Sequence, residues 1–416
     1  MTTILKNIYK EQNISVIQTN KFKNITINMR FALEFSVKRK AVLYLLSAMM
    51  FQSTKKYPDK VSFSKMKDML YGFNAYAYVN NYSNILVYNV FFDFINNRFL
   101  KDLNELDYLS FIDEILHNPL FTLEKLAEAK NNLRSNIKRK LDNPQNLAND
   151  NFYEEISKDD KRFEIYQNSK VLTELDNITL SDIKEVYQEL FNSRIDIYLI
   201  GDKLEQYIDY FKTYKSKKTL LLKEESNILK AREDIIFEKQ VSQSTLLYTF
   251  TTPFNRSSKD YLAFNLGNIV FGGIPTSLLF SEVREKHSLC YSIVCISLKS
   301  EGLVLVKTMI DQSNAQKAIE DIENQFNRMI SMDYEDDILI SAKQVLSNNL
   351  LSIDDDVDCL LDHLYINDIR GKEESIEEYI KKMNKVTKED IAKVFSMYQK
   401  YMIYFLKGVK NEENIQ

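Results

Sequence analysis

The chain of 416 residues contains little glycine, proline, histidine or cysteine and no tryptophan, with counts of 8 Gly, 5 Pro, 3 His and 3 Cys. At average usage a protein of this length would contain about 29 Gly and about 21 Pro. The glycines form no GxGxxG or GxxxxGK[ST] loop, so the usual nucleotide-binding motifs are excluded. Three cysteines do not suit a disulfide framework and favour a reducing compartment, so we expect a cytoplasmic protein.

The charges are nearly balanced, with 55 basic and 59 acidic residues and a formal net charge of -4. This balance does not indicate a nucleic-acid-binding surface. A hydrophobic fraction of 44% is too high for a disordered chain. No apolar run approaches about 18 residues, so we expect no membrane-spanning helix. The first ten residues alternate polar and apolar types, and we expect no secretory signal there.

The clearest pattern is an internal repeat. Residues 179–200 (TLSDIKEVYQELFNSRIDIYLI) resemble residues 387–406 (TKEDIAKVFSMYQKYMIYFL), shifted by 208 positions. Each copy begins with a Thr-x-x-Asp capping signal, continues with apolar residues at helical spacing and ends in a β-rich run. An offset near half the chain length predicts two homologous halves. Chance recurrence of a helix–strand pattern is the alternative.

Strand signals open each half, at residues 14–17, 25–29 and 244–250, and a helix is predicted from Thr122 to just before Pro144. Strands, then helices, then a late strand indicate the α+β class rather than alternating βαβ units. The charged segment 214–233 has little β pattern and is predicted to be a linker. It would join a first half of residues 1–213 to a second half of residues 234–416.

The few histidines restrict catalytic chemistry. His117, His287 and His363 are too far apart in sequence for an HExxH or HxxEH zinc helix. His287 lies three residues before Cys290, but Cys290 and Cys295 fall in a β-like run where cysteine is an ordinary core residue. A metal or nucleophile site at these residues is therefore a minor alternative.

The segment GGIPTSLLFSEVREKHSLCY (272–291) suggests another type of chemistry. Arg284 falls near the end of a predicted helix, and Tyr291 opens the next strand. A guanidinium fork and a phenol hydroxyl aimed into one cleft are suited to a carbonyl oxygen that becomes an oxyanion. The alternative is a salt bridge from Arg284 to Glu282 or Glu285, with Tyr291 in the core.

Four stretches resemble the insulinase/pitrilysin family of zinc metallopeptidases, which includes the mitochondrial processing peptidase. They are GGIPTSLLFSEVREKHSLCYSI (272–293), FQSTKKYP (51–58), YGFNAYAYV (71–79) and the two Thr-x-x-Asp helices. Together they extend the resemblance over most of the chain. The resemblance implies two homologous α+β domains, each a mostly antiparallel sheet covered by helices, which form a clam-shell around a peptide.

In active members of this family, a helix of the first half carries the HxxEH zinc motif. The resemblance places Tyr44, Ser47 and Ala48 at its His, Glu and His positions, and Asn136 at or near the third ligand. These residues cannot supply a tetrahedral zinc site with an open water position. The resemblance therefore implies no metal in this chain and zinc in a partner.

The family also has an Arg and a Tyr seven residues apart that contact the substrate carbonyl. Arg284 and Tyr291 match that spacing. Asn74, Ala75 and Tyr76 match the strand that, in active members, pairs with extended substrate by β-augmentation. In two-chain members one chain carries zinc and the other carries the Arg and Tyr, and this chain resembles the second.

The resemblance thus predicts the zinc-lacking subunit of a heterodimeric peptidase, inactive alone. Its partner would be a homologous HxxEH chain encoded nearby, and its substrate a peptide or unfolded precursor. Neither nucleic acid nor membrane is expected as a partner. The alternative is a non-catalytic peptide-binding or scaffold protein that retains the peptidase fold. An independent hydrolase with a Cys or Ser nucleophile is a third hypothesis.

Overall fold

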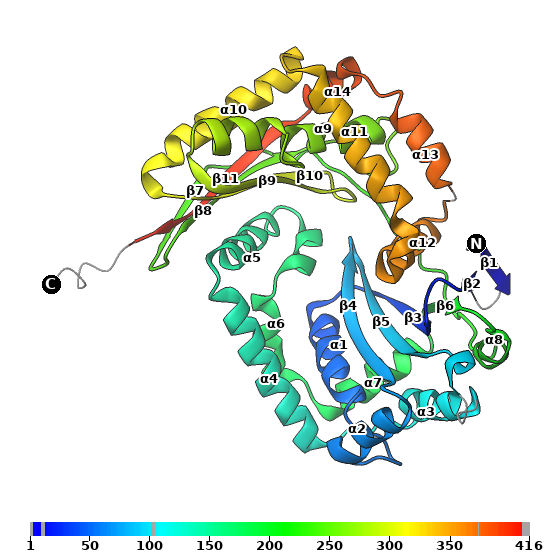
Figure 1. Cartoon of the computed structure of the whole chain (residues 1–416). Helices are drawn as coiled ribbons and strands as arrows, with labels where there is room; N and C mark the ends of the chain where they lie inside the picture. The colour runs from blue at the N-terminus through cyan, green and yellow to red at the C-terminus, as the bar shows by residue number, and fades with distance from the viewer. Residues whose placement is uncertain (1–2, 10–12, 101–104, 373, 410–416) are drawn as a thin grey trace. The chain divides into compact units, whose positions relative to one another are not determined.

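The computed structural model describes residues 3–9, 13–100, 105–372 and 374–409 (Figure 1). The chain forms two compact units, of which the first contains residues 1–138 and 165–222 and the second contains residues 139–164 and 223–416. The chain passes from the first unit to the second for the last time after Leu222, within the predicted linker 214–233. The role of this segment as a domain boundary stays a prediction. The assignment of residues 139–164 to the second unit had no signal in the sequence.

The first unit contains a six-stranded sheet in the order β1-β2-β6-β3-β5-β4. The strands are β1 (Thr3–Tyr9), β2 (Ile14–Gln18), β3 (Asn24–Glu34), β4 (Asn74–Tyr82), β5 (Ile85–Ile95) and β6 (Arg194–Gly201). The helices are α1 (Val37–Met50), α2 (Lys60–Met69), α3 (Glu105–His117), α4 (Leu123–Leu141), α6 (Ser169–Glu174), α7 (Leu180–Leu190) and α8 (Glu205–Phe211), with short 3₁₀ turns η1 (Asn97–Phe99) and η3 (Leu175–Asn177). The 3₁₀ turn η2 (Lys161–Tyr166) crosses from the second unit into the first.

The core of the first unit lies between its sheet and α1. All eight residues of β6 are buried, as are nine of the eleven residues of β3. Helix α1 begins after Ser36, whose side chain accepts a hydrogen bond from the backbone N–H of Arg39. It packs against α6, α7 and β4. The predicted strands at 14–17 and 25–29 and the predicted helix after Thr122 are confirmed.

The second unit contains a five-stranded sheet in the order β7-β11-β8-β10-β9. The strands are β7 (Ile235–Lys239), β8 (Ser244–Thr251), β9 (Cys290–Leu298), β10 (Leu303–Ile310) and β11 (Gln399–Gly408). The helices are α5 (Pro144–Ile156), α9 (Tyr261–Gly272), the π-helix η4 (Phe280–Lys286), α10 (Ala315–Ser331), α11 (Asp336–Leu351), α12 (Val357–Arg370), α13 (Ile376–Met383) and α14 (Lys388–Phe395), with 3₁₀ turns η5 (Gln312–Asn314) and η6 (Ile353–Asp355).

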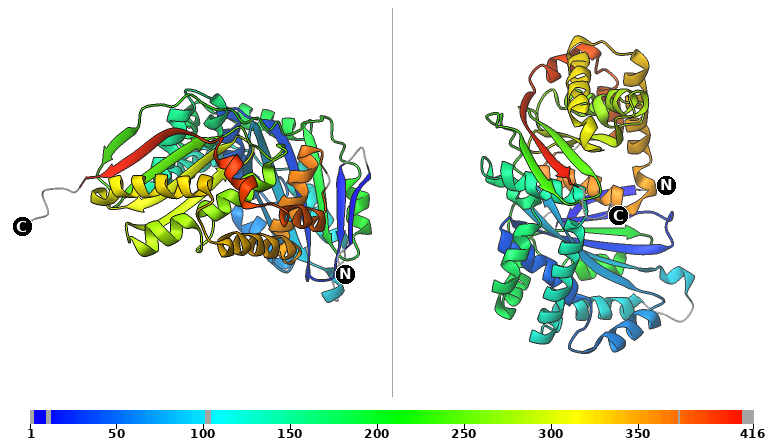
Figure 2. Two further views of the ribbon diagram at one scale, coloured as in Figure 1. Left: turned by 90° about the horizontal axis from the view of Figure 1, so that it is seen from above. Right: turned by 90° about the vertical axis from the view of Figure 1, so that its left-hand side faces the viewer.

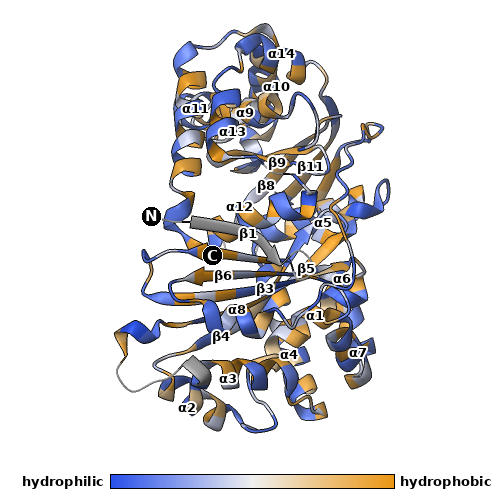
Figure 3. Ribbon diagram, turned by 90° about the vertical axis from the view of Figure 1, so that its right-hand side faces the viewer, coloured by the Kyte–Doolittle hydropathy of each residue, from blue (hydrophilic) through white to orange (hydrophobic). Residues whose placement is uncertain are grey.

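Helices cover both faces of the second sheet (Figure 2). On one face, α9 packs against β9, α10, α11, α13 and α14 around a hydrophobic core that includes Leu246, Phe250 and Phe264. On the other face, α5 packs against β8 and β11, where Asn151 donates a 2.9 Å hydrogen bond to the Tyr404 hydroxyl. The helices combine hydrophobic and hydrophilic residues (Figure 3), as expected of helices with one buried face.

The two sheets have the same topology. Aligning the orders β2-β6-β3-β5-β4 and β7-β11-β8-β10-β9 pairs each strand except β1 with a counterpart in the other unit. In each sheet one strand pair is parallel, β2 with β6 and β7 with β11, and the remaining pairs are antiparallel. The predicted α+β class, with mostly antiparallel sheets covered by helices, is confirmed. Strands β4 and β9 are counterparts, and each is an edge strand.

The charged segment 214–233 is extended and is anchored by hydrogen bonds. Within the first unit, the Lys217 amide donates to the Ser193 carbonyl at 3.2 Å. Within the second unit, the Arg232 amide donates to the Tyr401 carbonyl at 2.8 Å, and the Arg232 side chain also binds Glu155 of α5. Among the described helices, none is both long and apolar enough to cross a membrane.

Candidate functional site

Helix α1 carries Tyr44, Ser47 and Ala48, the residues that the resemblance places at the zinc-motif positions. Tyr44 is half-buried, and this burial raises the pKa of its hydroxyl. The Lys40 ammonium lies 5.8 Å from the Tyr44 ring centroid and donates to the carbonyl of Ile165 at 2.6 Å. Ser47 donates to the carbonyl of Leu43, one turn back in the same helix, at 2.9 Å. In this part of α1, the Lys40 ammonium and the Ser47 hydroxyl therefore both donate hydrogen bonds to backbone carbonyls.

These residues do not fit a zinc ion. Ala48 has no donor atom, and Asn136, on the exposed side of α4, offers an amide in place of a carboxylate. Among the residues that the structure describes, no three His, Cys, Asp or Glu side chains are grouped closely enough to hold a metal. We therefore derive no chemical step through a metal bound by this chain.

Arg284 lies in the π-helix η4 of the second unit. The His287 amide bonds to the Glu282 carbonyl at 3.0 Å, the wider spacing that defines a π-helix. The Arg284 guanidinium lies 4.4 Å from the centroid of the Phe280 ring and 3.7 Å from the Glu285 carboxylate. The side chain is 38% exposed. Of the two salt bridges that the sequence suggested as an alternative, the one to Glu285 is present only at long range. Glu282 pairs instead with Lys286 at 2.9 Å and with Arg328 at 3.4 Å.

Tyr291 lies at the start of the edge strand β9 and is 60% exposed. Ser292 pairs with Met309 and Cys290 pairs with Ile310, so the register shift leaves Tyr291 as the extra residue of a β-bulge. A bulge turns a side chain away from the alternation of its strand. The alternative in which Tyr291 belongs to the core is therefore wrong.

The helix end and the strand start are joined by short-range contacts. The Leu289 amide bonds to the Val283 carbonyl at 3.1 Å, and His287 Nδ1 lies 2.6 Å from the Asp321 carboxylate on α10. The Arg284 charge acts on the Cys290 thiol, directly before Tyr291 in the chain. The structure thus brings the segments that carry Arg284 and Tyr291 to one corner of the second unit.

The cysteines of this corner are not activated nucleophiles. Burial raises the pKa of the Cys290 thiol, and it raises that of Cys295 further. The Cys295 thiol lies 3.6 Å from the Asn268 side-chain oxygen in the core. A reactive cysteine requires a lowered pKa. His287 is bound to Asp321 rather than to either thiol, so it does not activate Cys290 or Cys295. Both cysteines therefore agree with the interpretation of ordinary residues in a strand.

Close approach of α9 to β9 explains one of the two adjacent glycines. A Cβ atom added at Gly272 would lie 2.7 Å from the Cβ of Cys295 and 2.8 Å from the Leu279 side chain. Any larger residue would push the helix from the strand. The two glycines in the sequence indicated that one helix ends here and another begins. The sequence gave no signal of the π-helix or of the β-bulge that follow.

Asn74, Ala75 and Tyr76 open strand β4, the edge strand of the first unit. Asn74 is exposed, Ala75 is buried and Tyr76 is 37% exposed. The Tyr76 ring stacks on Phe91 of β5, with centroids 5.1 Å apart. One side of β4 pairs with β5, and among the described strands none pairs with its other side. Such an edge can accept an extended peptide as a further strand.

Comparison with known proteins gives a consistent result. Residues 177–346 match the family model described as the peptidase M16 inactive domain. The chain is 26% identical over 419 residues to the probable inactive metalloprotease YmfF of Bacillus subtilis, with 98% of each chain covered. It is also 25% identical over 254 residues to an uncharacterized zinc protease of Rickettsia felis, covering 58% of this chain and 60% of that one.

Solved structures share the fold over the whole chain. A conserved protein from Enterococcus faecalis has a TM-score of 0.87 at 22% identity, covering 99% of this chain and 100% of that one. The peptidase M16 inactive domain from Pseudomonas fluorescens has a TM-score of 0.77 at 16% identity, covering 98% of each chain. With the duplicated sheet topology and the replaced residues of α1, these similarities lead to one conclusion. The chain is similar in sequence and in fold to the insulinase/pitrilysin (M16) family of metallopeptidases, and its sequence contains no HxxEH zinc motif.

Proposed function

We propose that this chain is the zinc-lacking subunit of a two-chain peptidase and that it supplies Arg284 and Tyr291 to the zinc site of a homologous HxxEH partner. The observation that supports the proposal most strongly is the local structure of this pair. Arg284 lies in a π-helix and Tyr291 in a β-bulge, two irregularities that are frequent at functional sites. A scaffold protein has no need for an exposed Arg and Tyr in this arrangement.

The chemistry of the two side chains fits the proposed role. In the complex, the partner's zinc would supply the activated water that attacks the peptide carbonyl. Arg284 and Tyr291 would donate hydrogen bonds to the carbonyl oxygen as it gains negative charge. The contact between Arg284 and Glu285 is long and exposed, so little free energy is lost when the guanidinium turns to substrate.

The open edge of β4 supports a peptide as the bound molecule. Asn74, Ala75 and Tyr76 would pair with an extended substrate through backbone hydrogen bonds, which are insensitive to side-chain identity. The same edge is also the feature that favours the alternative function, a non-catalytic peptide-binding or scaffold protein. The two functions differ in whether the peptide is cleaved when a zinc-binding partner is present.

Reconstitution separates these functions. The chain alone, each HxxEH homologue from the same genome alone, and each pair would be purified, analysed for zinc and tested on an unstructured peptide. We expect no stoichiometric zinc and no cleavage for the chain alone, and one zinc and chelator-sensitive cleavage for the complex. Tightly held zinc with cleavage by the chain alone would refute the proposal. Peptide binding without a complex or cleavage would favour the scaffold function.

A further inference from the structure

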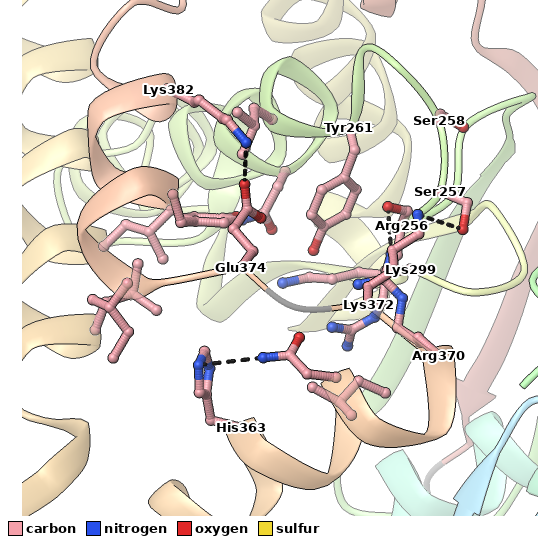
Figure 4. Close-up of a pocket in the computed structure, with 18 of the residues that line it drawn as sticks. Arg256, Ser257, Ser258, Tyr261, Lys299, His363, Arg370, Lys372, Glu374 and Lys382 are labelled. Atoms are coloured by element: carbon pink, nitrogen blue, oxygen red, sulfur yellow. Dashed lines mark hydrogen bonds and ion pairs between the residues drawn. The ribbon is translucent and has the colours of Figure 1, made fainter. Parts of the chain in front are cut away.

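The second unit contains a pocket of about 540 Å³ that the proposed peptidase function does not use (Figure 4). We call it the α9–α12 pocket. It is formed by the loop before α9, by one side of α9, by the residue after β9, and by parts of α11, α12 and α13. Among the described residues, its lining includes one acidic residue, Glu374, and six Arg and Lys residues: Arg256, Lys259, Lys299, Arg370, Lys372 and Lys382.

Two of these cations are neutralised by ion pairs. Lys382 lies 2.6 Å from the Glu374 carboxylate, and Arg370 lies 3.0 Å from Glu224. Figure 4 shows Lys382 and Glu374 together, apart from a group formed by Arg256, Lys299, Arg370 and Lys372. The positive charge that remains is therefore concentrated at one end of the pocket.

At that end Arg370 pairs with the buried Glu224. In contrast, Arg256, Lys299 and Lys372 have no ion pair among the described residues, which leave out Glu373. Burial, together with the charge of Arg256, lowers the pKa of Lys299 to about 8. The Arg256 Nε atom is buried without a hydrogen-bond acceptor. Within the described part of the chain, Lys372 donates to the Ser257 hydroxyl at 3.2 Å.

Such an arrangement is unfavourable in the free protein. The half-buried Lys299 ammonium and the buried Arg256 Nε–H lose hydration without gaining a counterion or an acceptor among the described residues. Both costs are removed by an anion that accepts hydrogen bonds from the two groups. This is the arrangement expected of a site whose ligand supplies the missing negative charge.

We propose that the α9–α12 pocket binds a small molecule through a phosphate group, held by Arg256, Lys299 and Lys372. A phosphate has two negative charges and several acceptor oxygens, which match three separate cations better than a carboxylate with one charge does. The rest of the pocket is partly apolar. Its walls offer contacts for the body of the ligand, from Tyr261, Leu262, Leu346, Leu350, Ile366 and Tyr379.

This site is separate from the pair proposed to act in catalysis. Tyr291 is near the start of β9 and Lys299 follows its end. Eight residues of extended strand span roughly 26 Å at about 3.3 Å per residue. Phosphate binding in the pocket therefore stands or fails independently of the role of Arg284 and Tyr291.

Calorimetric titration of the full chain with phenyl phosphate, inorganic phosphate and benzoate tests the proposal. We expect phenyl phosphate to bind more tightly than inorganic phosphate, because its ring contacts the apolar walls, and benzoate to bind weakest. Arg256→Gln and Lys299→Met should each weaken phenyl phosphate binding by about tenfold or more. Lys317→Gln, which removes one charge from an exposed position on α10, is the matched control and should bind as the wild type does.

Thermal melting without ligand provides a second measurement. Since Lys299 is half-buried and has no ion pair among the described residues, Lys299→Met should melt above the wild type while it loses affinity for the ligand. A lower melting temperature together with unchanged affinity would mean that Lys299 is structural. Absence of binding by both phosphates, equal loss in Lys317→Gln, or benzoate binding as tight as phenyl phosphate would overturn the proposal.

Discussion

At the scale of single residues, the second unit holds one cation, Lys299, in a position that its own stability does not favour. Burial lowers the pKa of Lys299, whereas Arg284 is partly exposed and contacts a ring. Residues that reduce stability and are nevertheless present tend to serve binding or catalysis. The replaced residues of α1 show the opposite pattern. Ser47 and Lys40 are satisfied by backbone carbonyls, so they stabilise the helix region and offer nothing to a metal.

Arg284→Ala and Tyr291→Phe should each abolish most activity of the reconstituted pair while leaving the fold and the complex nearly intact. Loss of one donor to a developing oxyanion typically lowers turnover by about 10²–10³-fold. A purely structural Tyr hydroxyl would instead contribute about 1 kcal/mol to stability and little to rate. The measurement is peptide cleavage with thermal melting alongside.

Lys286→Ala is the control for this pair of variants, because Lys286 is an exposed cation of the same π-helix that pairs with Glu282. It should retain nearly full turnover. If Tyr291→Phe lowers the melting temperature while turnover stays at the wild-type level, Tyr291 is structural and the scaffold function becomes the better explanation.

The stability difference between wild type and Lys299→Met should depend on pH. The folded-state pKa of about 8 lies below the ordinary value of 10.5, so the unfolded chain binds the Lys299 proton more tightly than the folded chain does. The wild type is therefore penalised fully below about pH 8, and the penalty disappears as pH rises toward 10.5. Its upper limit is about 3 kcal/mol.

Denaturant unfolding of both proteins at several pH values measures this effect. The advantage of Lys299→Met should be largest near neutral pH and should shrink steadily in alkaline solution. The many tyrosines titrate in both proteins, so their contribution cancels in the difference between the two free energies of unfolding. A difference that does not change between neutral and alkaline pH would show that Lys299 is not desolvated in the folded protein.

At the scale of elements, the repeated Thr-x-x-Asp signal forms the same structure twice. Thr179 and Asp182 make a capping box at the start of α7, and Thr387 and Asp390 make another at the start of α14. In the first copy Lys38 also lies 2.6 Å from Asp182. The Lys38 hydrogen bond, followed by those from Thr179, lowers the pKa of Asp182 to about 2. Each box positions the helix that precedes a buried strand.

Thr179→Ala and Thr387→Ala should each reduce the free energy of unfolding by about 1 kcal/mol, because a backbone N–H at the helix start loses its acceptor. Thr179→Ser and Thr387→Ser keep the hydroxyl and should remain close to wild type. Denaturant unfolding followed by circular dichroism measures these differences. Equal losses in the Ala and Ser variants would mean that the threonine methyl group, rather than the cap, provides the stability.

At the scale of the whole molecule, the two homologous units are not two consecutive stretches of chain. Residues 139–164 belong to the second unit, where α5 packs on β8 and β11. Tyr401 of β11 donates a 2.5 Å hydrogen bond to Asp159, which reinforces this attachment. A segment that lies between two parts of the first unit in the sequence therefore belongs to the second unit in the structure.

Cleavage within 214–233 should yield two fragments of similar size on a denaturing gel that remain associated under native conditions. The first fragment would carry α5, whose packing surface on β8 and β11 lies in the second fragment. A protease site inserted after Leu221, an exposed residue, allows cleavage at a chosen position. Size-exclusion chromatography of the cleaved protein measures the result. Separation into two folded fragments would contradict the assignment of α5 to the second unit.

The sequence by itself determined the class of the fold, the duplication and the resemblance to a peptidase family. The capping signals, the helical spacing of residues 179–200 and the strand patterns are local, and local geometry follows from neighbouring residues alone. The replacement of the zinc motif was equally readable, because a metal site requires particular side chains and Tyr44, Ser47 and Ala48 are not among them.

Only the tertiary structure decided the remainder. The exposure of Tyr291 depends on a bulge created by pairing with β10, and that pairing partner is distant in sequence. The placement of α5 depends on strands far along the chain, beginning at Ser244 and Gln399. Lys299 shares its pocket with residues of α9, α12 and α13, and among the described lining residues the acidic side chain, Glu374, pairs with Lys382 instead. Burial and pairing are properties of residues that meet in space, so no pattern along the chain could reveal them.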